Sequence, residues 1–225
     1  MAAGGLTRVR GTARYRRRKP IPAIVVVCLL VVAAIIVWVQ VIDKAGNVNA
    51  ETACPTPANS AQAGTALPHN ALDKVAPQPA GAVKVQVLNA SQQRGAAQQA
   101  ALALIDLGFQ QAGNPSDDPL YPGGDMKCQG QIRFGANGVG SARTLSLVLP
   151  CTQLVRDSRQ DATVDLAIGQ NFSQVSPNAQ ALSALKQLAA WAAAHPAPTG
   201  GQQAQGTLAP QLAPSLLSAA HATTC

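Results

Sequence analysis

The alternation of apolar and polar residues predicts strands in the middle of the chain. Val83, Val85 and Val87 alternate with Lys84 and Gln86, which is the two-residue period of a strand with one buried face. Further strands are predicted at residues 109–111, 131–134 and 162–168.

Helical spacing of apolar residues follows the first and second clear strands and returns near the end. It covers residues 94–107, 139–149 and 178–194. Gly108 suits the end of the first helix, and Ser176 and Pro177 suit the start of the last. The order β-α-β-β-α-β predicts an α+β fold, a small sandwich with helices on one face of the sheet. This domain, with its final helix, is expected over residues 81–195.

Residues 21–42 form an apolar stretch that has no charged residue and a single polar one, Gln40. Because about 20 apolar residues cross a membrane as a helix, the stretch predicts one transmembrane helix. The basic arm, residues 1–20, carries seven positive charges and no acid. Positive residues stay on the cytoplasmic side, so the N-terminus is expected inside and residues 43–225 outside. A signal peptide cleaved after Ala50 is the alternative.

Two segments lack periodicity and are rich in small or polar residues. Residues 43–80 are expected to form an extended linker, with a brief helical turn within residues 67–75. Residues 196–225 are expected to form a mobile, low-complexity tail.

The net charge of +7 equals the charge of the basic arm. The other 205 residues hold ten basic and ten acidic side chains, so their charges cancel. A nucleic-acid-binding domain gathers its cations on a folded face. Nucleic acid is therefore not an expected partner.

Four cysteines follow the apolar stretch: Cys54, Cys128, Cys151 and Cys225. An even number outside the membrane favours disulfides, and no histidine lies close enough in sequence to favour zinc. The predicted helix at 139–149 must run back along the strand at 131–134, and the two cover similar lengths. We therefore predict the pair Cys128–Cys151, which leaves Cys54–Cys225 as the second pair, with Cys225 bonded to another chain as the alternative. No metal site is predicted.

The turn after the first strand is the candidate binding site. Asn89 and Ser91 end the strand, and Arg94 stands near the next helix N-terminus, where an anion would meet free backbone N–H groups. No glycine fingerprint lies between Leu88 and Gly95, so a nucleotide cofactor is not expected.

Other polar residues offer little sign of catalysis. The three histidines, His69, His195 and His221, all lie outside the predicted core. Asp117 and Asp118 precede Pro119 and are interpreted as solvated loop carboxylates. No catalytic residues are therefore predicted.

Several short motifs together resemble the LytR C-terminal domain family over about residues 82–172. They are V-K-V-Q-V-L-N-A-S, then G-A-A at Gly95, L-x-x-L-G-F ending at Phe109, I-R-F-G, and T-V-D-L-A-I-G-Q. The resemblance implies an extracytoplasmic module in envelope maintenance.

In larger members of that family, the domain follows a LytR-CpsA-Psr catalytic domain that ligates glycopolymers to peptidoglycan. The motifs of this chain match only the non-catalytic part. The resemblance thus implies a membrane-anchored binding module, not an enzyme, needed for envelope integrity. Its partner would be an envelope protein, a polyprenyl-linked precursor or peptidoglycan. The alternatives are an enzyme acting on envelope glycopolymers or lipids, and a cleaved, secreted envelope factor.

The arginines before Ile21 predict the topology. A reporter active only outside the cytoplasm should be active when fused after Cys225 and inactive when fused at the N-terminus. Reporter activity and cell fractionation measure this, and activity of the N-terminal fusion alone would refute the orientation.

Overall fold

The computed structural model describes residues 21–58, 63–196, 210–222 and 225. The predicted basic arm lies outside these residues, as does part of the predicted tail. The chain divides into two compact units, Met1–Asp43 and Lys44–Cys225. The second unit holds the sheet, its core and both disulfides, described below.

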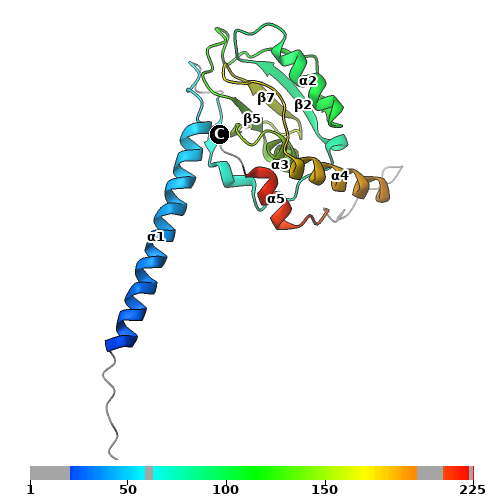
Figure 1. The fold of residues 1–225 in the computed structure, drawn as a ribbon. Helices are drawn as coiled ribbons and strands as arrows, with labels where there is room; N and C mark the ends of the chain where they lie inside the picture. The colour runs from blue at the N-terminus through cyan, green and yellow to red at the C-terminus, as the bar shows by residue number, and fades with distance from the viewer. Residues whose placement is uncertain (1–20, 59–62, 197–209, 223–224) are drawn as a thin grey trace, which may run out of the picture. The chain divides into compact units, whose positions relative to one another are not determined.

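Helix α1 (Ile21–Thr52) covers the apolar stretch (Figure 1). The large apolar side chains within residues 25–39 are 51–68% exposed. None of the helices in the described part of the chain is long and apolar enough to cross a membrane. The transmembrane helix therefore stays a prediction.

Residues 44–225 build a mixed sheet whose strands run in the order β1-β6-β5-β7-β2-β3, with β4 also paired to β2. Strand β2 is parallel to β3, β4 and β7, and β5 is parallel to β6. The β5–β7 and β1–β6 pairs are antiparallel. The strands are β1 (Thr65–Leu67), β2 (Lys84–Asn89), β3 (Gln110–Gln111), β4 (Ser116–Asp117), β5 (Gly130–Phe134), β6 (Gln153–Arg156) and β7 (Val164–Ile168).

The predicted order of elements is present as β2-α2-β3-β5-α3-β7, so an α+β fold is confirmed. Strands β1, β4 and β6 and the helix at Pro214–His221 were not predicted. The helices are α2 (Ala96–Asp106), α3 (Val139–Val148), α4 (Ala179–Ala194) and α5 (Pro214–His221), and the 3-10 turns are η2 (His69–Leu72), η3 (Ala80–Ala82) and η4 (Ala136–Gly138).

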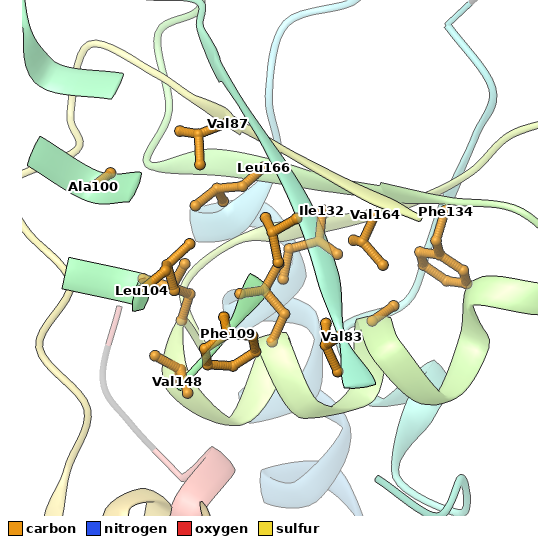
Figure 2. Packing of buried hydrophobic residues seen from close by; sticks show 14 of the residues in the cluster. Val83, Val87, Ala100, Leu104, Phe109, Ile132, Phe134, Val148, Val164 and Leu166 are labelled. Carbon is orange, nitrogen blue, oxygen red and sulfur yellow. The ribbon is translucent and has the colours of Figure 1, made fainter. Parts of the chain in front are cut away.

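Helices α2 and α3 cover one face of the sheet. The alternating residues of β2, β5 and β7 point into this core, where Val87 lies beside Leu166 in the parallel register. Leu104 of α2 and Val148 of α3 belong to the same core, as Figure 2 shows. Helices α4 and α5 pack behind α3 through Leu147, Ala181, Ala184 and Ala220.

The other face of the sheet carries a second, smaller cluster. Leu88 and Ala167, neighbours in register, pack there with residues from the loop after β4, which are Tyr121, Met126 and Cys128. Asp118 is buried beneath this loop and accepts two hydrogen bonds from Arg133, at 3.0 and 2.7 Å. Its interpretation as a solvated carboxylate was wrong, because a cation on β5 holds it inside.

The segment predicted to be an extended linker is partly built into the domain. Strand β1 pairs with β6, and Leu72 of η2 is 3% exposed in the main core. The predicted tail likewise contains α5, so that segment is not a wholly mobile coil. Both were missed because their apolar residues fall in short groups among Ala, Pro and Gln, and no long periodic pattern marks them.

The cysteine pairing was predicted wrongly: the bridges are Cys54–Cys128 and Cys151–Cys225. The expectation that Cys128 and Cys151 lie at a similar height along the strands agrees with the register, because Gln131 pairs with Gln153 in the parallel β5–β6 pair. However, Cys128 belongs to the cluster on the second face, whereas Cys151 follows α3, which covers the first. The sheet therefore separates them.

Replacing Cys54 and Cys128 by serine should destabilise residues 44–225 by about 4 kcal/mol, because the bridge closes a loop of 74 residues. Urea unfolding measures the loss. Non-reducing peptide mapping provides the control: a peptide joining Cys128 to Cys151 would contradict the placement of the two cysteines.

Candidate functional site

The predicted binding turn closes on itself. Asn89 Oδ1 accepts hydrogen bonds from the Ser91 backbone N–H at 3.1 Å and from Ser91 Oγ at 2.8 Å. Ser91 Oγ in turn accepts from the Gln93 N–H at 3.2 Å. Asn89 and Ser91 are therefore brought together as turn-forming residues, in the way these residue types commonly close strand-to-helix turns.

Arg94 is exposed just before α2 and forms no hydrogen bond or ion pair with another described residue. Gly95, with φ of 78°, precedes the helix and has no side chain to cap it. The anion site at Arg94 stays a prediction, since Asn89 and Ser91 do not point their polar atoms to it.

A polar cluster with a buried arginine and a buried histidine lies elsewhere, between η2, α3 and α5. Asp73, just after η2, accepts from Arg143 Nη1 of α3 at 3.1 Å, and His221 Nδ1 at the end of α5 lies 3.2 Å from the same oxygen. The rings of His221 and His69 stack at 4.1 Å, and His69 Nε2 donates to the Pro150 carbonyl at 2.7 Å. We call Asp73, Arg143, His221 and His69 the Arg143 cluster.

Burial dominates the electrostatics of the cluster. The pKa of His221 is lowered to about 4, first by burial and then by the nearby His69 and Arg143, with Asp73 opposing. Burial also lowers the pKa of Arg143, although Asp73 favours its charge. His221 is therefore neutral at pH 7 and donates a hydrogen bond to Asp73, while Arg143 keeps its charge.

A cleft of about 540 Å³ opens beside this cluster. Arg143, Asp73 and Lys74 provide its charged side chains, and α5 with the residues before it provides a largely apolar wall. Arg143 is 1% exposed, and its Nε has no hydrogen-bond partner among the described residues. A volume of this size is typical of small-molecule sites.

Little in the sequence points to this site. Arg143 is the only charged residue of α3, and a charged residue on a helix usually faces water. Here α3 has no solvent face over residues 141–148, because the sheet lies on one side and α4 and α5 on the other. The expectation that no histidine enters the core was also wrong, because α5 places His221 at 7% exposure.

Comparison with known proteins decides the family. The cell envelope integrity protein Cei of Mycobacterium tuberculosis (strain ATCC 25618 / H37Rv) is 44% identical in an alignment of 169 residues that covers 73% of this chain and 78% of Cei. The chain belongs to the Cei family. Within this Cei-family chain, the model described as LytR cell envelope-related transcriptional attenuator matches residues 82–172. The LytR C-terminal domain suggested by the motifs is thereby confirmed.

A solved structure has the same fold. The soluble domain of a conserved hypothetical secreted protein from Mycobacterium marinum is 35% identical, with a TM-score of 0.59, and the match covers 73% of this chain and 99% of that one. In the Cei-family chain, Arg143 lies inside the range of the LytR C-terminal domain, whereas Asp73 and His221 lie outside it. The cluster thus joins the domain to its flanking segments.

The His221 pKa predicts a pH dependence of stability. His221 takes up its proton in the unfolded chain near pH 6.5 but in the folded chain only near pH 4. Its contribution to the free energy of unfolding is therefore full above pH 6.5 and is lost as pH falls toward 4, by up to about 3 kcal/mol.

His221→Gln should flatten this slope for residues 44–225, as measured by urea unfolding at several pH values. The matched control is His195→Gln, because His195 is exposed and outside the cluster. An equal slope in wild type and His221→Gln would show that His221 is protonated as easily in the folded chain as in the unfolded one.

Proposed function

We propose that this Cei-family protein is a membrane-anchored, non-catalytic binding module outside the cytoplasm, and that cell-envelope integrity depends on it. The observation that carries the proposal is the 44% identity to the cell envelope integrity protein Cei over most of both chains. A partner would be an envelope protein, a polyprenyl-linked precursor or peptidoglycan.

The apolar stretch supports the anchor. The large side chains of α1 within residues 25–39 leave at least half of their surface exposed, and a helix apolar on every side is unfavourable in water. The basic arm before the stretch supports a cytoplasmic N-terminus.

The two disulfides support the extracytoplasmic side. Both lie within Lys44–Cys225, and such bridges persist in oxidising compartments. The anchor and the bridges thus agree on one orientation, whether or not the chain is later cleaved after Ala50.

A binding role is favoured over catalysis by the state of the polar groups. In the strand-to-helix turn, Asn89 and Ser91 are engaged with each other, and in the Arg143 cluster the neutral His221 is hydrogen-bonded to Asp73. A general acid or base works best when its pKa lies near the operating pH, and burial lowers the pKa of His221 to about 4.

Deleting the gene should lower resistance to detergents and to wall-targeting antibiotics, and the full chain should restore it. A chain carrying residues 44–225 behind a cleavable signal separates anchored from secreted function. Full rescue by that secreted form would reject the need for an anchor.

The purified unit, residues 44–225, should transfer no glycopolymer from a polyprenyl-linked donor to peptidoglycan. Transfer above a blank without protein would instead support the enzyme alternative.

A further inference from the structure

The cleft beside α5 combines one excess positive charge with an apolar wall. Of its lining side chains, Arg143 and Lys74 are cationic and Asp73 is anionic. Leu212 and Leu217 also line the cleft, from α5 and the residues before it. A ligand that satisfies both features must carry a negative group and an apolar part.

The guanidinium of Arg143 is incompletely satisfied. Its hydrogen bond to a described residue comes from Nη1, which reaches Asp73, while Nε is buried and unpartnered. Asp73 is itself 48% exposed, so water weakens its compensation of the buried charge. An unpaired donor on a buried cation is costly, and an incoming anion would remove that cost.

The free edge of the guanidinium also limits the shape of the head group. Arginine recognises planar or tetrahedral oxyanions by two parallel N–H donors. With Nη1 engaged by Asp73, the Nε side remains for a carboxylate or phosphate. The exposed Lys74 at the same cleft adds a second, more mobile positive charge.

We propose that the cleft binds an amphipathic anion, with its carboxylate or phosphate head on Arg143 and its aliphatic chain along Leu212 and Leu217. This rests on the proposed function, in that it names the ligand class of the binding module. A lipid-like envelope component of this chemistry fits a domain held at a membrane.

Isothermal titration of residues 44–225, the unit that contains its own core and both disulfides, tests the proposal. Dodecanoate and farnesyl phosphate are the two anionic probes. The probe that binds more tightly shows whether the head group is a carboxylate or a phosphate. Dodecanol and farnesol, which lack the charge, should bind at least about tenfold more weakly. Inorganic phosphate, which lacks the chain, should give no heat up to about 1 mM.

Variants locate the binding in the cleft. Ala76→Trp places a large side chain in the cleft from an exposed position and should abolish binding of both anions. The matched control Ala190→Trp, on the exposed surface of α4, should leave affinity unchanged.

Charge variants test the head group. Lys74→Glu should weaken both anions, whereas Lys127→Glu, an equal charge change at an exposed residue outside the cleft, should not. Arg143→Lys keeps the charge but loses the fork, and should cost about tenfold in affinity. Thermal unfolding checks that each variant is folded. If Arg143→Lys is unfolded, the loss of binding in Ala76→Trp decides whether the anion occupies the cleft.

Equal affinity for the neutral alcohols, unchanged binding in Ala76→Trp, or no binding of either anion would overturn the proposal. These failures are separable from failure of the proposed function. A full chain that restores envelope resistance while its exterior binds neither anion refutes only the ligand class, whereas a full chain that restores nothing refutes the function itself.

Discussion

The central strands of the sheet are buried on both faces, and every other feature of the domain follows from the need to cover them. Residues 130–134 of β5 are buried without exception, although they include Gln131 and Arg133. A strand of this kind requires an apolar cover on one side and a polar partner wherever a charged side chain is enclosed. Helices supply the first cover, and an irregular loop supplies the second.

The two disulfides belong to these two covers. Cys54–Cys128 ties the segment after α1 to the loop over the second face, where Asp118 neutralises Arg133. Cys151–Cys225 ties the C-terminus to the end of α3 on the helical side. Since each cover is held by its own bridge, segments of low complexity become ordered parts of the domain.

The helical cover has a second layer, and this layer creates the candidate site. Helices α4 and α5 enclose α3, so that Arg143 is 1% exposed, pairs with Asp73 and lines a cleft. The same enclosure keeps His221 neutral. Charge, cavity and pH sensitivity therefore share one cause, which is the docking of the last helix. In the strand-to-helix turn, by contrast, the polar side chains of Asn89 and Ser91 are hydrogen-bonded to each other.

The sequence by itself determined the local elements and the family. Alternating valines specify β2, helical spacing specifies α2, α3 and α4, and the motifs at 82–172 identify the LytR C-terminal domain, because these signals are periodic or contiguous. Only the tertiary structure decided which face each cysteine occupies and which charged residues are buried. The lengths of the predicted strand and helix give the positions of Cys128 and Cys151 along the sheet, but they do not give the face of the sheet on which each cysteine lies. Likewise, Arg143 and His221 are buried by contacts between segments far apart in the chain, and a local sequence pattern does not report such contacts.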